Sequence, residues 1–396
     1  MTTQEAEKNV RLYYWFRLLD EPLFWGPILI TFISRVSGMS LSQIYVMESI
    51  CVVGLFLLEI PSGALADLIG RRKTILIGSC LLFCDIMVFA SAINPAMIWI
   101  ANLIWVCGFS LISGADSALL YDTLKVLGRE SEFKKIEGRA ISYRLFLLAG
   151  CAITVGYLAS INIRLPVYLS AGFKLLFVVV IYFFIEPPMT RQGRYNWREH
   201  LGLMKISILF VANHKNIKWI ISFVVIIGVA SKIWFFSYNP YFELVDLPLI
   251  YFGWLFCGLN IIAAISSFFS DWIARKIGDL GSIILILAVI GIPILLMGSY
   301  VAKIMVLLVL MQNIARGHLT PFIGHFLNQY LDSENRATVI SIKSAVVSLG
   351  QFVMLGLFGW SLKLYNLPSC LQILGVFTLA LSLVLIVSYW RIFGRK

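Results

Sequence analysis

The chain has 396 residues, of which 60% are hydrophobic and only 13% charged, whereas a soluble domain carries about 25% charged residues. Apolar runs of roughly 20 residues recur from end to end, and each is long enough to cross about 30 Å of hydrocarbon. These properties exclude a soluble globular protein. Cations that gather in cytoplasmic loops explain the net charge of +11 better than a nucleic-acid partner does. We therefore predict an all-α polytopic membrane protein.

Twelve apolar spans are predicted, and the charges between them set their orientation. Loops after even-numbered spans carry groups of cations, such as Arg71, Arg72 and Lys73, whereas loops after odd-numbered spans hold at most one each. Because cations accumulate in cytoplasmic loops, this alternation places both termini in the cytoplasm. The spans are predicted near residues 15–34, 43–65, 74–93, 96–121, 139–161, 165–186, 217–238, 249–270, 280–300, 302–329, 337–363 and 368–391.

The longest connector, residues 187–216, divides six spans from six. We therefore predict an N-terminal half over 1–186 and a C-terminal half over 217–396. Within the connector, the stretch NWREHLGLMKISILFVANHK mixes cations with large apolar residues. This mixture predicts an amphipathic helix on the cytoplasmic membrane surface, and a soluble linker is the alternative.

The stretch EIPSGALADLIGRRKT, residues 59–74 and called the signature loop below, places unusual charge between two apolar runs. Its pattern G-x-x-x-D-x-x-G-R-R-x-T resembles the loop between helices 2 and 3 of the major facilitator superfamily. The resemblance implies twelve helices in two six-helix halves. A degenerate second copy, SFFSDWIARKIGD, follows the eighth span. The positions that carry the match are Gly63, Asp67, Gly70, Arg71, Arg72 and Thr74.

The signature loop also has a physical interpretation. We expect Gly63 to permit a close helix approach and Gly70 to permit a tight turn. We expect Asp67 to face the N-terminus of a helix, plausibly the eleventh span, and Arg71 to reach Asp122 at the cytoplasmic end of the fourth span. Such contacts would make the loop a conformational latch. The alternative is that its cations only orient the chain.

Ionisable residues within spans are functional candidates, because burying a charge in the bilayer is costly. Asp20 and Glu21 in span 1, Asp116 in span 4 and Arg144 in span 5 lie near the cytoplasmic side. They are expected to form one ion-paired cluster, which serves either as an inner gate or as a static network. Asp116 and Arg144 are therefore candidate substrate ligands, and Asp20 and Glu21 are candidate proton carriers.

Three further acids and bases in the N-terminal half have simpler expected roles. Asp85 in span 3 and Lys174 in span 6 lie nearer mid-membrane, and the resemblance places helices 3 and 6 at the periphery. We therefore expect them to form a structural ion pair. Glu48, near the outer end of span 2, is expected to reach the membrane interface.

The buried ionisable groups of the C-terminal half are basic, and no acid lies at comparable depth in the same spans. Unpaired buried cations need anions, so Arg316, Lys232 and Lys343 predict an anionic or carboxylate-rich substrate. The alternative for the two lysines is that they reach the interfaces along their aliphatic stems. His318 and His325 either couple protons or only form hydrogen bonds between helices.

These features predict a secondary transporter that works by alternating access. The chain has no P-loop, HExxH or GxSxG motif, so we expect neither an ATP-driven pump nor a hydrolase, and no cofactor or metal site. The substrate is predicted to be a small organic anion, such as a siderophore-like compound or a metabolite, and its transport is expected to be coupled to protons. Efflux of cationic drugs is the alternative, and a non-transporting membrane sensor is an alternative of another class. We expect a monomer in the bacterial inner membrane.

Overall fold

The computed structural model describes residues 1–21, 23–188, 211, 213–328 and 333–393. In this part of the chain the regular structure is helical. The predicted amphipathic helix of the connector lies outside the described residues. The chain forms two compact units, which are described in turn. Unit 1 comprises Met1–Ser40, Cys51–Tyr195 and Leu249–Cys257, and unit 2 comprises Leu41–Ile50, Asn196–Pro248 and Gly258–Lys396.

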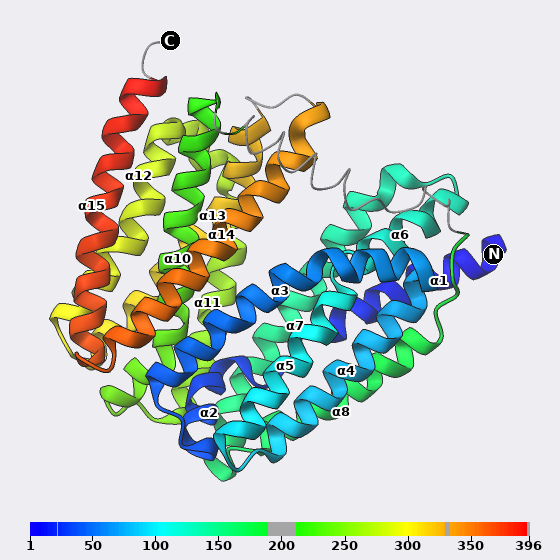
Figure 1. The fold of residues 1–396 in the computed structure, drawn as a ribbon, viewed down its shortest axis with the longest axis horizontal. Helices are drawn as coiled ribbons and strands as arrows, with labels where there is room; N and C mark the ends of the chain where they lie inside the picture. The colour runs from blue at the N-terminus through cyan, green and yellow to red at the C-terminus, as the bar shows by residue number, and fades with distance from the viewer. Residues whose placement is uncertain (22, 189–210, 212, 329–332, 394–396) are drawn as a thin grey trace. The chain divides into compact units, whose positions relative to one another are not determined.

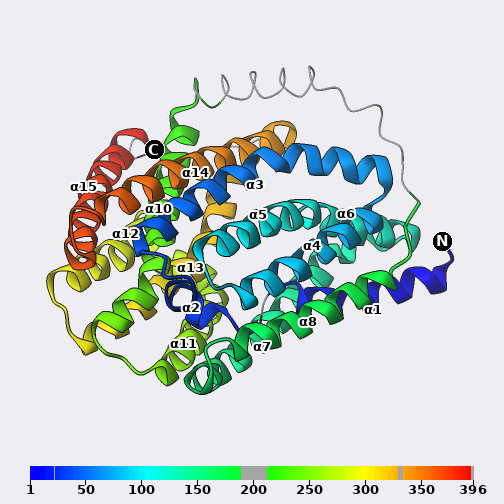
Figure 2. The same cartoon turned by 60° about the horizontal axis from the view of Figure 1, so that its bottom comes forward.

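Unit 1 is a helical bundle in which α4 packs against both α5 and α8 (Figures 1 and 2). Helix α1 packs against α6, α7 and α8, so that it closes the other side of the bundle. The elements are α1 (Thr3–Leu19), η1 (Gly26–Ile28), α2 (Leu29–Ser37), α3 (Leu41–Ile69, from Cys51 onward in this unit), α4 (Arg71–Ser91), α5 (Pro95–Ile112), α6 (Ala115–Val126), η2 (Glu130–Glu132), α7 (Phe133–Ile161) and α8 (Leu165–Tyr182).

Unit 2 is a second helical bundle, in which α12 packs against α15 and α13, and α10 packs against α14 and α15 (Figure 1). Large aromatic side chains of α10, including Trp234, Tyr238 and Phe242, are fully buried in its core. The elements are α10 (Lys215–Leu244), α11 (Leu249–Phe268, from Gly258 onward in this unit), α12 (Ser270–Ser299), η3 (Lys303–Leu308), α13 (Val309–Asn328), α14 (Ser333–Ser361) and α15 (Leu367–Phe393).

Eleven segments of the described chain are long and apolar enough to cross a membrane, and Gly26–Ser37 is a shorter apolar helix. The predicted first span, residues 15–34, is not one continuous helix, because α1 ends at Leu19 and α2 begins at Leu29. The Lys174 ammonium donates to the freed carbonyls of Leu19 and Asp20. A side chain from α8 therefore satisfies the backbone groups that the break exposes, as a membrane helix requires.

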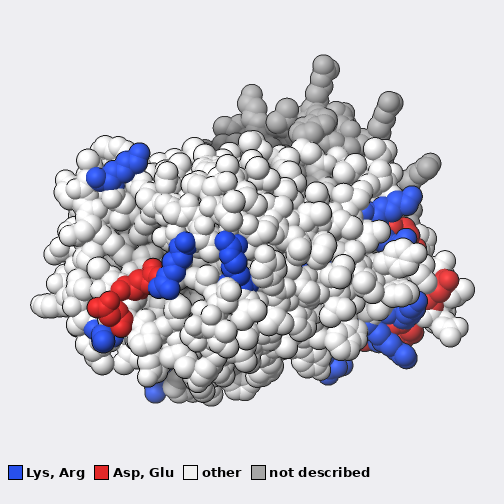
Figure 3. Space-filling model, turned by 90° about the horizontal axis from the view of Figure 1, so that it is seen from below, with Lys and Arg blue, Asp and Glu red and all other residues white. Residues whose placement is uncertain are grey.

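The outer surface of the bundles is apolar. Large side chains such as Leu68, Phe146 and Phe268 are more than three-quarters exposed. On the face shown in Figure 3, Lys, Arg, Asp and Glu side chains occupy only a few places. A soluble protein rarely exposes so much contiguous apolar surface, so this surface fits contact with lipid.

Two glycines bring α7 and the first residues of α11 into close contact within unit 1. A Cβ atom added to Gly156 would lie 2.6 Å from the carbonyl oxygens of Leu249 and Ile250. A Cβ atom added to Gly253 would lie 2.2 Å from the carbonyl oxygen of Ala152. Both clashes are with backbone atoms, which cannot rotate away, so only glycine permits this helix crossing.

We expect the substitution Gly156→Ala to destabilise the protein by about 1–3 kcal/mol, because it forces α7 and α11 apart. The measurement is the apparent melting temperature of the purified protein. Gly150→Ala is the matched control: it lies on the same helix, and a Cβ atom there meets nothing within 4 Å. Equal melting temperatures for the two variants would contradict the predicted contact.

Candidate functional site

Arg17, in the last turn of α1, is the centre of a buried ion-pair network in unit 1. Its guanidinium nitrogens lie 2.8 Å from Asp116 on α6, 3.2 Å from Asp20 and 2.6 Å from Glu137 on α7. Its Nε also donates to the Tyr13 hydroxyl at 2.9 Å. A guanidinium presents five N–H donors in a fixed plane, so one side chain can serve several acceptors at once.

Arg144 completes this network from α7. Its guanidinium lies 3.1 Å from Asp20 and 3.1 Å from Glu21. The predicted ion-paired cluster of Asp20, Glu21, Asp116 and Arg144 is therefore confirmed, with Asp116 joined to it through Arg17. Sequence reasoning missed Arg17 itself. Its spacing of three residues before Asp20 on a helix was the available signal, since such residues are neighbours on the helix surface.

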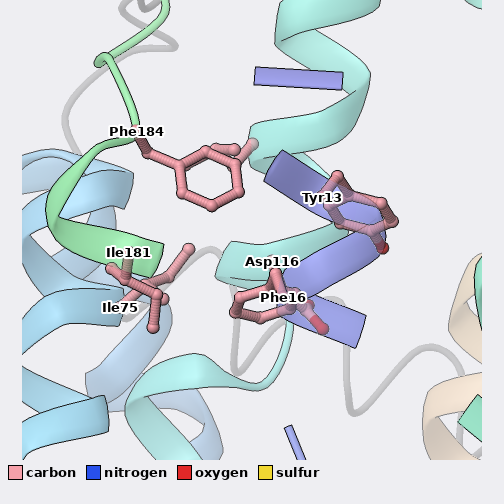
Figure 4. A pocket seen from close by; sticks show the side chains of 7 residues that line it. Tyr13, Phe16, Ile75, Asp116, Ile181 and Phe184 are labelled. Carbon is pink, nitrogen blue, oxygen red and sulfur yellow. The ribbon is translucent and has the colours of Figure 1, made fainter. Parts of the chain in front are cut away.

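Asp116 also borders a small apolar cavity, drawn in Figure 4. The volume of this cavity is about 10 Å³, which is close to the space that a single water molecule needs. One oxygen of the carboxylate accepts from the Ser117 amide, and the other lies against Arg17. The carboxylate is thus fully engaged. The cavity is lined by Tyr13, Phe16, Ile75, Asp116, Leu119, Ile181 and Phe184.

The predicted Asp85–Lys174 ion pair is not a direct contact, although the two charges interact. Both side chains are buried, but no pair within 4 Å joins them among the described residues. Lys174 instead donates to the carbonyls at the end of α1, and its ammonium lies 4.6 Å from the centre of the Phe177 ring. The sequence did not predict the break after α1, and the carbonyls at this break are the acceptors that Lys174 binds in place of Asp85.

The signature loop is held by a carboxylate that the motif does not contain. Gly70 has a φ of +103°, which a glycine adopts without strain, and this confirms its predicted turn. The next two amides, of Arg71 and Arg72, donate to Glu186 at 2.7 and 2.9 Å. Glu186 follows α8 and therefore caps the N-terminus of α4, where a negative charge is favoured.

The predicted pairing of Arg71 with Asp122 is confirmed, since their side chains lie 2.6 Å apart. Arg72 donates instead to the Tyr182 carbonyl at the end of α8. The loop therefore joins α4 to both α6 and α8. Whether these contacts open and close remains a prediction.

Two expectations for the signature loop fail or remain untested. The expected close approach at Gly63 is wrong, because a Cβ atom there would meet no atom within 4 Å in the described part of the protein. Asp67 is exposed. Its expected partner at the start of the eleventh span lies among residues 333–338, whose side chains are outside the described set.

In unit 2, Lys232 has an acidic partner. Its ammonium lies 3.8 Å from the Glu48 carboxylate and 4.7 Å from the centre of the Phe236 ring. The expectations that Lys232 is unpaired and that Glu48 reaches the interface are therefore wrong. The missing acid comes from the start of α3, far away in sequence, whereas the prediction considered only the spans of the C-terminal half.

Arg316 on α13 and Lys343 on α14 differ from Lys232. Within the described residues, neither side chain has a hydrogen-bond or ion-pair partner. Arg316 is exposed and Lys343 is half-buried. Among the described residues, no acid lies within ion-pair distance of either cation, and their role in substrate binding stays a prediction.

His318 on α13 is fully buried. Its Nδ1 lies 2.8 Å from the Ser270 hydroxyl, whereas its Nε2 has no hydrogen-bond partner in the described part of the chain. One ring nitrogen is thus available to another group. The side chain of His325 lies outside the described residues.

Comparison with known proteins identifies the family. The sequence model described as Major Facilitator Superfamily matches residues 14–310. The chain belongs to the Major Facilitator Superfamily. The family match and the apolar helices together make it a multi-pass membrane protein.

Two curated relatives of this superfamily member are bacterial. An uncharacterised MFS-type transporter of Bacillus subtilis (strain 168), YxaM, is 29% identical over 185 residues, which make up 45% of each chain. An uncharacterised transporter of Buchnera aphidicola (subsp. Schizaphis graminum, strain Sg) is 25% identical over 152 residues, or 38% of this chain and 37% of that protein. The chain thus matches less than half of either relative's length.

Solved structures share the fold across nearly the whole chain. The nucleoside transporter NupG has a TM-score of 0.78 and 14% identity, and the alignment covers 99% of this chain and 100% of that one. The D-xylose-proton symporter has a TM-score of 0.65 and 14% identity, with coverage of 97% and 96%. The POT family transporter PepTSo has a TM-score of 0.73 and 11% identity, with coverage of 100% and 99%. At these identities the likeness concerns the fold alone.

We expect Arg17→Gln to destabilise this superfamily member by about 3–5 kcal/mol, because Asp116 and Glu137 lose their cationic partner and Asp20 keeps only Arg144. The measurement is the apparent free energy of unfolding in mild detergent. Arg11→Gln is the matched control, since Arg11 is exposed on the same helix. A loss of stability no larger than that of the control would show that the network contributes little.

We expect Glu186→Gln to destabilise the protein by about 1 kcal/mol, because an amide provides less negative charge than a carboxylate at the start of α4. The apparent melting temperature measures this effect. Glu130→Gln is the control, because no hydrogen bond or ion pair of the Glu130 side chain occurs in the described chain. Equal melting temperatures would argue against the capping role.

Proposed function

We propose that this transporter moves small organic anions, rich in carboxylate groups, by secondary active alternating access. The observation that supports this substrate class is that Arg316 and Lys343 in unit 2 have no ion-pair partner within the described part of the chain. A cation within an apolar span costs at least about 2.5 kcal/mol on insertion scales. Such a residue is retained in a span when it has a function, and binding an anion is the function that its charge allows.

The contrast with unit 1 strengthens this proposal. Arg17, Arg144 and Arg71 each contact at least one carboxylate of their own unit. Lys232 has a carboxylate partner as well, so we do not propose it as a primary substrate ligand. Arg316 is the stronger candidate of the remaining two, because a guanidinium binds a carboxylate through two parallel hydrogen bonds.

His318 is the proposed proton carrier. An imidazole is the side chain whose ordinary pKa lies near physiological pH, and the Nε2 atom of His318 has no partner within the described residues. Asp20, in contrast, already accepts hydrogen bonds from two guanidinium groups. We therefore prefer His318 over Asp20 and Glu21 for proton coupling.

The signature loop is the proposed cytoplasmic latch. The Arg71–Asp122 pair lies at the N-terminus of α4, with Glu186 bound to the adjacent amides. Both termini are proposed to face the cytoplasm of a bacterium, with the protein acting as a monomer in the inner membrane. The charge alternation between spans supports this orientation.

Efflux of cationic drugs through Asp20 and Asp116 is less well supported. Both carboxylates already contact Arg17, and Asp20 also contacts Arg144. A cationic drug would have to displace these guanidinium groups. A membrane sensor without transport activity has no specific observation in its favour.

We expect Arg316→Gln to weaken carboxylate binding by about tenfold to a hundredfold, because a charge-assisted bidentate contact is lost. Binding is measured as thermal stabilisation of the purified protein by acetate, succinate and citrate. Arg391→Gln, at the exposed end of α15, should bind these compounds like the natural protein. Carboxylate binding that is unchanged in Arg316→Gln, or absent in the natural protein, would contradict the proposal.

A further inference from the structure

Unit 1 contains a second cavity that the proposed anion transport does not use. Its volume is about 270 Å³, far more than a single water molecule needs. The break between α1 and η1 forms one wall, and α4, α5 and α8 form the others. The lining residues that matter here are Asp20, Trp25, Asp85, Trp105, Phe109 and Lys174.

Asp85 gives this cavity its chemical character. The residue is only 4% exposed, and its side chain lines the cavity. In the described part of the protein it makes no hydrogen bond and no ion pair within 4 Å. Lys174 interacts electrostatically with Asp85, but it donates its hydrogen bonds to the carbonyls of Leu19 and Asp20. The carboxylate therefore faces open space inside the bundle.

The charges around the cavity do not balance. The connected network and the cavity wall hold five carboxylates but only three cations. An acid that is buried without a close partner either takes up a proton or binds a cation, and the space beside Asp85 leaves room for a cation. The carboxylates are Asp20, Glu21, Asp85, Asp116 and Glu137, and the cations are Arg17, Arg144 and Lys174.

The walls indicate which kind of cation fits. Trp25, Trp105 and Phe109 line the cavity, and the last two rings stack with their centroids 5.3 Å apart. Aromatic faces attract organic cations, and tryptophan does so most strongly. The described residues hold no group of three or more His, Cys, Asp or Glu side chains placed to bind a metal ion. A proton alone would need neither this volume nor these walls.

We propose that this cavity is a binding site for a small organic ammonium ion. The Asp85 carboxylate provides the counter-charge, and the indole rings of Trp25 and Trp105 provide the cation–π surface. The inference uses residues of unit 1 alone. It does not depend on Arg316 or Lys343, so the two proposals can fail separately.

The test measures binding of choline and ethanolamine to the purified full-length protein by titration calorimetry at constant pH and ionic strength. The neutral compound 3,3-dimethylbutan-1-ol, which has the shape of choline without its charge, is the control ligand. We expect both ammonium compounds to bind and the alcohol not to bind. Asp85→Asn should weaken ammonium binding at least about tenfold, and Trp105→Leu should weaken it about fivefold.

Asp246→Asn is the matched control variant. Asp246 is exposed and has a φ of +51°, which asparagine tolerates, so binding should be unchanged. If Asp85→Asn does not fold, Trp25→Leu and Trp105→Leu provide the test with the same ligands. Three results would overturn the proposal: neither ammonium compound binds, the alcohol binds equally well, or the cavity variants bind like the natural protein. Carboxylate binding in Asp85→Asn should be retained, which separates this site from Arg316.

Discussion

Neutralising carboxylates in a medium of low dielectric constant is the constraint on which unit 1 depends. Acidic residues from α1, α6 and α7 meet within the bundle, and ionised carboxylates can stay there only with hydrogen-bonded partners. Arg17 satisfies three of them from a single helix end. A second cation, Lys174, serves the backbone in the same region, because it donates to the carbonyls that the end of α1 leaves free.

The same principle operates at the N-terminal end of α4, where backbone amides take the role of the cation. Glu186 accepts hydrogen bonds from two successive amides just after Gly70, and Arg71 pairs with Asp122. The end of α8, the start of α4 and the end of α6 are thereby joined by charge. Any movement of one of these helix ends must break or carry along contacts of the other two.

Sequence reasoning predicted the class of fold because hydropathy and loop charge are local properties, readable span by span. It predicted the Arg71–Asp122 contact through a motif that resembles a known loop. It failed to predict contacts in which the partner lies in another helix and outside any motif. Arg17, Glu186 and the Lys232–Glu48 pair are examples. The break after Leu19 was missed for a related reason, since the side chain that satisfies it comes from α8.

The assignment of Leu41–Ile50 to unit 2 has a consequence for how the protein is made. This segment is synthesised early, but its partners follow much later in the chain. The Tyr45 hydroxyl bonds to Ser237, which is 192 residues further on, and Glu48 pairs with Lys232. Until α10 has been translated, Tyr45 and Glu48 at the start of α3 lack these partners. The native contacts of this segment can therefore form only after α10, which ends at Leu244, has been translated.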